Sequence, residues 1–241
     1  MRVTPAMALA IDENQKIQSI DWAQIDTVLL DMDGTLLDLH FDNTFWLHAV
    51  PQHYAALNQV SSEEAKRSLA PIFERETGTL NWYCLDFWSD TLGIDIATLK
   101  REEAAGIGWR PHAESFLKKL RASHCEAILI TNAHPTTLEI KLEKLTFAPL
   151  LDKLYTSHEF GAPKESPAFW EHLQKAQPFD PKRTLFVDDS EHVLVAAADY
   201  GVEYLVTLRQ PDSQQEPRMT TRFPSIHHFD EIFAGLPDHD S

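Results

Sequence analysis

The chain has 241 residues, of which 43% are hydrophobic and 10% aromatic, enough to bury a substantial core without disulfides or structural metals. The formal net charge is -16, and no basic cluster is present, which argues against nucleic acid as a partner. The two cysteines lack a ligand-like spacing, and the N-terminal apolar run is too short for a signal peptide or a membrane span. We therefore expect a cytoplasmic protein with no membrane partner; composition leaves the oligomeric state open.

The first predicted strand is the apolar run at residues 28–30, which leads directly into Asp31 and Asp33. A period of two turns both carboxylates to the same side of the strand, and Gly34 permits a tight turn after them. Two carboxylates that converge at an apolar strand end are electrostatically costly without a cation. This segment is therefore interpreted as part of a charged site rather than as a simple capped turn.

Roughly 100 residues separate the first predicted strand from the next, far more than a crossover helix needs. Helical patterns cover residues 44–57, with an interruption at Pro51, and residues 61–76, 80–92 and 96–105. Ser61 and Glu64 form a predicted capping box. The apolar positions Leu80, Cys84, Phe87, Trp88 and Leu92 recur at helical spacing, which is more typical of a core-facing stripe than of a base-stacking surface.

The second strong strand is predicted at residues 127–130 and ends in Thr131 and Asn132. A helix is expected from Pro135 onward. A hydroxyl, an amide and the N–H groups of a helix N-terminus together suit a bound anion. A weaker strand is expected at residues 153–156.

Lys164 follows a turn-rich connection just before the next predicted helix, where its ammonium can neutralise a phosphate. The strand predicted at residues 184–187 then ends in Asp188 and Asp189. Adjacent carboxylates repel each other, and a hard divalent cation with oxygen ligands, most often Mg²⁺, relieves that repulsion. A last strand is expected at residues 204–206, and the polar stretch 209–222 is expected to be a long surface loop.

Strands that alternate with helices predict an α/β protein with a doubly wound parallel, Rossmann-like sheet. The long helical stretch before the second strand predicts an inserted all-helical cap domain. We expect the catalytic core to comprise residues 1–38 and 110–241, and the cap, which governs substrate specificity, to comprise residues 39–109.

The polar strand ends, taken in order, resemble the motifs of the haloacid dehalogenase-like hydrolase superfamily. Its first motif, DxDGT, is found at residues 31–35, and its second, an apolar strand ending in Ser or Thr, ends here at Thr131. The third motif is a lysine, here Lys164, and the fourth is an acidic pair, here Asp188 and Asp189. An all-helical insertion between the first two motifs is one cap subtype of that superfamily.

The resemblance implies a Mg²⁺-dependent phosphate-monoester hydrolase in which Asp31 attacks phosphorus and forms an aspartyl-phosphate. Asp33 would first protonate the leaving oxygen and then deprotonate the attacking water. The family pattern implies that the phosphate is held by Thr131, the backbone N–H of Asn132, and Lys164. It also implies that Mg²⁺ is held by Asp31, the backbone carbonyl of Asp33, and Asp189, with Asp188 as an outer neighbour.

Longer strings are similar to bacterial GMP/IMP nucleotidases: LLDMDGTLLDLHF at residues 29–41, TLNWYCLD at 79–86, LITNAHP at 129–135, FGAPKE at 160–165 and VDDSE at 187–191. This resemblance implies a 5′-nucleotidase whose substrate is a purine nucleoside monophosphate. The second string falls in the predicted cap, so Asn81, Trp82 and Tyr83 are the residues expected to contact the substrate. Asn81 is the expected reader of the base.

The same core motifs also fit a sugar-phosphate phosphatase or a phosphomutase, which remain the alternative. A 2-haloacid dehalogenase shares the nucleophilic Asp but needs neither Mg²⁺ nor a second aspartate such as Asp33. A catalytically silent binding protein is disfavoured because every motif position is filled.

Overall fold

The computed structural model describes residues 9–12, 17–219 and 221–237. Its main sheet is built from β3 (Thr27–Leu30), β4 (Glu126–Thr131), β5 (Lys153–Thr156), β6 (Thr184–Val187), β7 (Tyr204–Leu208) and β8 (Ser225–Ile226). The strands are parallel and lie in the order β5-β4-β3-β6-β7-β8. A separate antiparallel pair is formed by β1 (Leu9–Ile11) and β2 (Ile17–Ile20).

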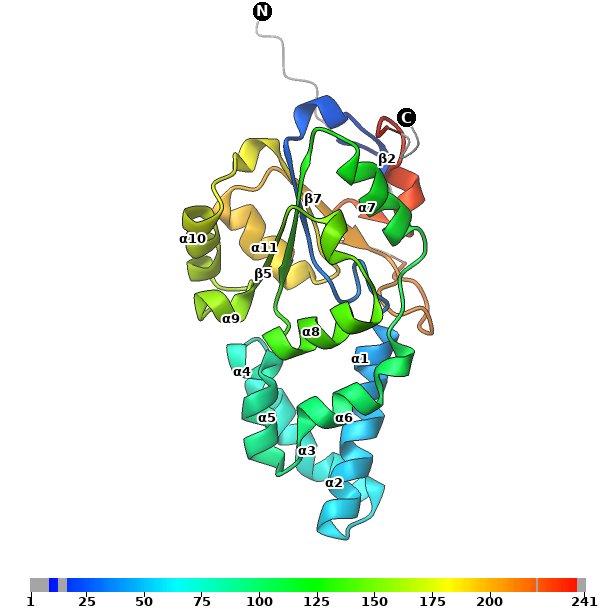
Figure 1. Cartoon of the computed structure of the whole chain (residues 1–241), viewed down its shortest axis with the longest axis vertical. Coiled ribbons are helices and arrows are strands. Elements are labelled where there is room, and N and C mark those ends of the chain that lie inside the picture. The colour runs from blue at the N-terminus through cyan, green and yellow to red at the C-terminus, as the bar shows by residue number, and fades with distance from the viewer. Residues whose placement is uncertain (1–8, 13–16, 220, 238–241) are drawn as a thin grey trace, which may run out of the picture.

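The predicted doubly wound α/β class is confirmed, because both faces of the parallel sheet are covered by helices (Figure 1). The helices outside the long insertion after β3 are α7 (Ala113–Arg121), α8 (Pro135–Lys144), α9 (Ser157–Phe160), α10 (Pro167–Ala176) and α11 (Glu191–Tyr200). Short 3₁₀ helices are η1 (Trp22–Gln24), η4 (Ala148–Leu150), η5 (Pro181–Arg183) and η6 (Phe229–Ile232). All five predicted strands are present; β1, β2 and β8 were not predicted.

Successive strand residues contribute to two separate cores, one on each face of the sheet. Val28 and Leu30 pack in the cluster that contains the buried residues of α7 and η6. Leu29 packs instead in the cluster that contains the buried residues of α10 and α11. This alternation is the period of two expected of a strand, and it explains why the strands are apolar on both faces.

Residues 40–106, which we call the helical segment, form a third core of their own (Figure 1). The segment contains α1 (His40–Thr44), the π-helix η2 (Phe45–Ala49), α2 (Val50–Asn58), α3 (Ser62–Glu76), α4 (Leu80–Tyr83), α5 (Leu85–Leu92), α6 (Ile96–Glu102) and the 3₁₀ helix η3 (Ala104–Gly106). The expected capping box between Ser61 and Glu64 is present at the start of α3.

The predicted helix interruption at Pro51 is wrong. The elements α1, η2 and α2 follow one another without a gap, and Pro51 lies in the first turn of α2. A proline inside a helix clashes with the carbonyl of the preceding turn. The π-helix immediately before Pro51 widens that turn, and the chain continues helically through the proline.

The single helix predicted at residues 80–92 is also wrong, because the chain breaks at Cys84. Cys84 has extended backbone angles of φ -87° and ψ 111°, and its sulfur accepts a hydrogen bond from the Phe87 N–H at 3.5 Å. The indole N–H of Trp88 donates to the carbonyl of Trp82 at 2.8 Å, across the break. Leu80 is therefore out of line with the stripe on α5, although Trp82 of α4 still packs against the core of the helical segment.

The polar stretch 209–222 contains no helix or strand in its described residues, as expected of a loop. It is not wholly a surface loop, however, since Arg209 and Asp212 are buried. Arg218 donates from Nη1 to the Asp189 carbonyl at 2.7 Å, which brings this loop to the edge of the sheet. In the described part of the chain, no helix has the length and apolar character required to cross a membrane.

Candidate active site

The chain turns sharply after β3, and this turn places two carboxylates at the edge of the sheet. The Asp31 N–H donates to the Val187 carbonyl at 3.0 Å and so continues the β3–β6 ladder. Gly34 follows with φ +83°, and a Cβ atom built there would lie 2.7 Å from Cγ of Asp189. A glycine is therefore needed at this position for Asp189 to approach the turn.

Lys164 is the cation around which the buried carboxylates gather. Its Nζ lies 2.5 Å from Oδ1 of Asp31 and 2.7 Å from Oδ2 of Asp188, and the side chain is only 2% exposed. Burial by itself lowers the pKa of the ammonium, but the Asp188 and Asp31 charges outweigh burial and raise the pKa above its ordinary value. Lys164 is therefore charged throughout the physiological range.

Thr131 and Asn132 follow β4, where the sequence places them, and Asn132 fixes the backbone of Lys164. The Asn132 side chain accepts from the Lys164 N–H at 2.8 Å and donates to Oε2 of Glu165 at 2.9 Å. The Thr131 hydroxyl accepts from the Ala133 N–H at 3.0 Å, which leaves its own proton for another acceptor. The Asn132 amide thus supports the lysine, whereas the Thr131 hydroxyl is available to a ligand.

Asp31, Asp188 and Asp189 bring one carboxylate oxygen each to within 4.8 Å of one another. Burial and, to a smaller extent, the Asp31 charge raise the pKa of Asp189 to about 7. Burial likewise raises the pKa of Asp188 well above its ordinary value, against the opposing effect of Lys164. The three groups therefore carry an excess of buried negative charge that a hard, oxygen-preferring cation relieves.

The two members of the second acidic pair differ in their partners. Both carboxylate oxygens of Asp188 are engaged, Oδ2 by Lys164 and Oδ1 by the Ser190 N–H at 2.8 Å. Among the described residues, the Asp189 carboxylate accepts no hydrogen bond, and its ion-pair partner Arg218 lies 4.0 Å away. Asp189 is thus the member of the pair with oxygen lone pairs to offer a metal.

Asp33 belongs to a chain of four charges, two buried lysines and two partly buried aspartates, that joins the sheet to the helical segment. Lys141, on α8, forms ion pairs with Asp33 and with Asp42, the latter at 2.6 Å, and Lys100, on α6, pairs with Asp42 at 2.7 Å. Burial raises the pKa of Asp33 to about 6, although Lys141 opposes the shift. Burial would also raise the pKa of Asp42, but Lys100 and Lys141 lower it to about 2.

Sequence reasoning missed Lys141, Asp42 and Glu165 altogether. Lys141 lies on α8, the helix expected from Pro135 onward, and its side chain is only 1% exposed. A lysine in a short helix next to the second motif carries no local sign that it is buried. Its partners lie 108 and 99 residues away, so only the fold brings them together.

A cavity of about 320 Å³ opens between the sheet edge and the helical segment. Its wall includes the motif residues Asp31, Asp33, Thr131, Asn132, Lys164, Asp188 and Asp189. From the helical segment, Trp82 and Tyr83 also line it, and the Tyr83 hydroxyl donates to Oε1 of Glu165 at 2.8 Å. Asn81 does not line it, because its amide donates to Oε2 of Glu76 within the segment.

The fold and this site define a hydrolase of the α/β class. The chain belongs to the haloacid dehalogenase-like hydrolases, whose family profile matches residues 25–201. The resemblance drawn from the four motifs is thereby confirmed.

Known relatives support the same family. The chain is 42% identical over 218 residues to GMP/IMP nucleotidase YrfG of Escherichia coli strain K12, a match that covers 90% of this chain and 98% of the relative. The GMP/IMP nucleotidase YrfG of Shigella flexneri matches with the same values. A HAD phosphatase from Thermococcus onnurineus superposes with a TM-score of 0.73 at 18% identity, covering 89% of this chain and 100% of that structure. The structural match at this identity shows the fold alone.

The raised pKa of Asp189 predicts how stability depends on pH in metal-free protein. A carboxyl whose folded pKa is about 7 instead of about 3.8 binds its proton more tightly when folded, so it lowers stability as pH rises between these values. Mg²⁺ binds the deprotonated form and should raise the melting temperature more at about pH 8 than at about pH 5. Thermal denaturation in EDTA and in Mg²⁺, at a series of pH values, measures both effects.

The Asp189→Asn variant is the matched control for this experiment. His158 contributes the opposite slope up to about pH 6.5, because burial lowers its pKa to about 4. Subtracting the variant's pH profile isolates Asp189, and the difference should show wild type losing stability toward about pH 7. A difference profile that is flat or rises with pH would contradict the assignment.

Proposed function

We propose that this chain is a Mg²⁺-dependent phosphate-monoester hydrolase, a 5′-nucleotidase that forms an aspartyl-phosphate on Asp31 and acts on GMP and IMP. The observation that carries the proposal is the Lys164 ammonium between Asp31 and Asp188 on the wall of the cavity. A nucleophilic carboxylate, a second aspartate and a buried cation therefore face one space large enough for a phosphate ester.

We infer that residues 1–38 and 110–241 form the catalytic core and residues 39–109 a cap over its active site. The separate hydrophobic cluster of the helical segment supports this division. The segment meets the sheet edge through ion pairs, which can rehydrate when they separate. Closing the cap would exclude water from the phosphoryl transfer, and opening it would exchange substrate and product.

The residues present fit a Mg²⁺ ion, since three carboxylates with hard oxygen ligands meet at one point. Asp31, the backbone carbonyl of Asp33, and Asp189 would hold the ion, while Asp188 holds Lys164. When bound, Mg²⁺ supplies positive charge to the nonbridging phosphate oxygens.

In the first step, the Asp31 oxygen not engaged by Lys164 attacks phosphorus, and the bond from phosphorus to the ester oxygen breaks. Asp33 gives its proton to the departing oxygen; a pKa of about 6 makes it a competent acid near neutral pH. In the second step, water attacks the aspartyl-phosphate and returns a proton to Asp33. The bond from phosphorus to Asp31 breaks, which releases inorganic phosphate and restores both carboxyl groups.

Thr131, the backbone N–H of Asn132, and Lys164 would hold the nonbridging phosphate oxygens. The Thr131 hydroxyl has a proton to donate, and Lys164 carries a permanent charge. Asn132 serves in addition through its side chain, which ties Lys164 to Glu165 and through Glu165 to Tyr83.

The purine preference rests on the identity to the two GMP/IMP nucleotidases and on Tyr83. Because the Tyr83 proton is directed to Glu165, the phenol oxygen presents lone pairs to the cavity. Guanine and hypoxanthine carry an N1–H that can donate a hydrogen bond to such an oxygen, whereas N1 of adenine has no proton and is itself an acceptor. Trp82, on the same wall, offers an indole face for stacking. Tyr83 therefore replaces Asn81 as the proposed reader of the base.

Replacing the nucleophile should abolish turnover without unfolding the protein. In Asp31→Asn the amide is isosteric but cannot attack phosphorus, so the barrier should rise by at least about 4 kcal/mol, or about a thousandfold in rate. Hydrolysis of a generic aryl phosphate with Mg²⁺ and with EDTA gives the readout. The exposed Asp199→Asn on α11 is the matched control and should keep full activity. Near-native turnover by Asp31→Asn, or turnover in EDTA, would reject the mechanism.

Substitutions of the two members of the acidic pair should affect Mg²⁺ affinity and thermal stability to different extents. Asp189→Ala removes a proposed direct ligand and should weaken Mg²⁺ affinity more than Asp188→Ala, whose loss as an outer partner costs about ten- to a hundredfold. Asp188→Ala instead strips Lys164 of one of its two carboxylates and should lower the melting temperature more. Calorimetric titration ranks the two variants by Mg²⁺ affinity, and thermal denaturation ranks them by melting temperature. If Asp188→Ala weakens Mg²⁺ binding more than Asp189→Ala does, Asp188 is the ligand.

Among nucleoside 5′-monophosphates, GMP and IMP should be hydrolysed better than AMP, CMP or UMP. An unpaired polar group on the wrong base costs roughly 1–3 kcal/mol, or about ten- to a hundredfold in kcat/KM. Steady-state kcat/KM for the five nucleotides and a set of sugar phosphates tests the claim. A preference for a hexose phosphate would favour a sugar-phosphate phosphatase or a phosphomutase instead.

Two variants test the proposed reader within the same assay. Tyr83→Phe should reduce the ratio of GMP to AMP hydrolysis by about tenfold, because the oxygen that accepts from N1–H is lost. Asn81→Ala should leave the ratio unchanged, since Asn81 lies outside the cavity wall. If GMP and IMP remain preferred in Tyr83→Phe, the substrate assignment stands and the choice of Tyr83 is wrong.

A further inference from the structure

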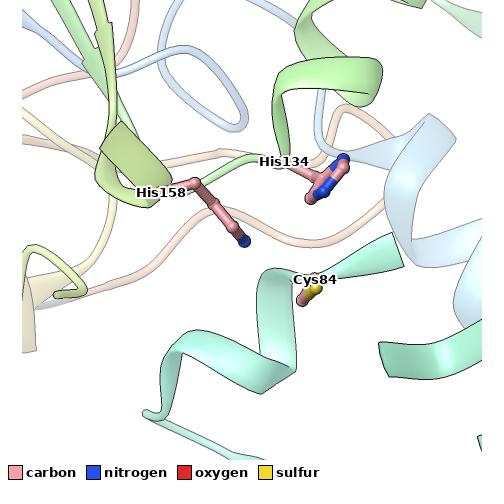
Figure 2. A group of neighbouring side chains, drawn as sticks. All are labelled: Cys84, His134 and His158. Atoms are coloured by element: carbon pink, nitrogen blue, oxygen red, sulfur yellow. The ribbon is translucent and has the colours of Figure 1, made fainter. Parts of the chain in front are cut away.

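Three metal-ligating side chains from distant parts of the sequence converge beside the active site but take no part in the proposed chemistry. Cys84 lies at the break between α4 and α5, His134 precedes α8, and His158 lies in α9. One ligand atom from each lies within 4.8 Å of the other two. Figure 2 shows the three side chains projecting into the space between the helical segment and the turns that follow β4 and β5.

We propose that Cys84, His134 and His158 form a binding site for Zn²⁺. A bound ion would connect the helical segment to the main sheet and the helices packed on it, which we call the sheet domain. One sulfur and two imidazole nitrogens are the ligand set that zinc prefers, with a fourth position left for another group. The set is chemically unlike the all-oxygen group of Asp31, Asp188 and Asp189, which suits Mg²⁺.

His158 gives the strongest support, because its imidazole is otherwise unexplained. Both ring nitrogens are buried, and neither has a hydrogen-bond partner among the described residues. Buried polar atoms left unpaired cost free energy and are rare in folded proteins. Burial lowers the pKa of the ring to about 4, so the ring is neutral and carries a lone pair for a metal. A metal ion would satisfy the nitrogen that faces Cys84 and His134.

His134 and Cys84 are also in a suitable state to act as ligands. Nδ1 of His134 accepts from the Thr136 N–H at a long 3.3 Å, while Nε2 lies 3.7 Å from Oδ2 of Asp86. A metal at Nε2 would move the ring proton to Nδ1, so the weak bond to Thr136 would be lost. The Phe87 N–H donates to the Cys84 sulfur from the start of α5, so the sulfur is held on the side of the helix break that faces the two histidines.

The observed separations show how far the site must contract to bind. Bond lengths of about 2.3 Å to sulfur and about 2.0 Å to nitrogen in a tetrahedral site place the ligand atoms about 3.3–3.6 Å apart. Because no two of the ligand atoms are more than 4.8 Å apart, each pair must approach by at most about 1.5 Å, within reach of small changes in torsion angle. Asp86, whose carboxylate is exposed, can supply the fourth ligand, or a water molecule can do so. Binding would release the thiol proton of Cys84.

The position of the site gives it a regulatory consequence that rests on the proposed function. Cys84 belongs to the helical segment and the two histidines to the sheet domain, so a bound ion would hold the two together. Tyr83, the neighbour of Cys84, already contacts Glu165 of the sheet domain. If the segment must open to exchange substrate and product, Zn²⁺ at this site slows turnover.

Cobalt spectroscopy tests binding without reference to activity. The full chain is stripped of metal, Mg²⁺ is added in excess to occupy the acidic group, and Co²⁺ is titrated in. A thiolate ligand produces a charge-transfer band in the near ultraviolet, and a tetrahedral site produces intense visible bands; Zn²⁺ should abolish both. Co²⁺ at the carboxylates cannot give the thiolate band. Absence of that band in the wild-type chain would overturn the proposal.

The two cysteines provide a matched pair of variants. Cys84→Ser should lose the thiolate band and bind Zn²⁺ at least about tenfold more weakly, whereas Cys125→Ser, at the residue before β4, should keep the band and the affinity of wild type. His158→Leu should abolish the rise in melting temperature caused by Zn²⁺ without lowering the melting temperature of metal-free protein, because it removes unpaired buried nitrogens. A band that survives in Cys84→Ser or disappears in Cys125→Ser would overturn the site.

The effect on turnover is tested with saturating Mg²⁺ and increasing Zn²⁺. Zn²⁺ should lower kcat in wild type and Cys125→Ser but not in Cys84→Ser. If Zn²⁺ inhibits Cys84→Ser as strongly as wild type, zinc acts at the carboxylates. That result would overturn the proposal that zinc slows turnover by holding the helical segment to the sheet domain. A chain that hydrolysed no phosphate ester would refute the proposed function, yet the cobalt band would still decide the zinc site.

Discussion

A lysine ammonium enclosed by two carboxylates is the interaction on which the active-site architecture depends. Lys164 is as fully buried as the apolar core, and a buried charge is tolerated only when it is paired and held in good geometry. The fold supplies that geometry from three sides. Asp31 and Asp188 end the adjacent strands β3 and β6, and the Asn132 side chain after β4 fixes the lysine backbone. The strand order therefore determines which charges meet, at the point where ligands bind in such sheets.

A second set of charges, two buried lysines and two partly buried aspartates, joins the helical segment to this site. Its apolar residues form their own cluster, so the segment does not rely on the sheet for its core. Its contact with Asp33 runs through Asp42 and Lys141, whose charges compensate one another while the segment is in place. Separating the segment would expose these charges to water, which solvates them well. An interface of this kind is easier to open than an apolar one of equal area, and its opening changes the electrostatic surroundings of the proposed acid.

The sequence was informative wherever a single local pattern determined the outcome. Apolar runs predicted the strands, and the polar residues at their ends predicted Asp31, Thr131 and Asp189 at one edge, because parallel strands end together. The structure departs from expectation where distant parts of the chain decide. Nothing near Lys141 indicates that it is buried, since its partners are Asp33 and Asp42. The helix break at Cys84 was missed for a different reason, because the apolar residues keep helical spacing across it.

That break illustrates how a local irregularity takes on a role that periodicity cannot reveal. The spacing of Leu80, Cys84, Phe87 and Trp88 is regular, and a straight helix would have aligned all four on one stripe. Instead, the Trp88 indole bonds to the Trp82 carbonyl, and α4 turns away from α5.

The turn at Cys84 has opposite consequences for neighbouring side chains. Trp88 stays in the core of the helical segment, while Tyr83 reaches the sheet domain and contacts Glu165. Cys84, between them, is placed opposite His134 and His158 rather than within the stripe. His134 lies three residues after Thr131, so the proposed phosphate-binding hydroxyl and the first histidine of the proposed zinc site are separated by a single turn of chain. Because one group offers only oxygen ligands and the other offers sulfur and nitrogen, the proposed Mg²⁺ and Zn²⁺ sites differ in the ion that each prefers.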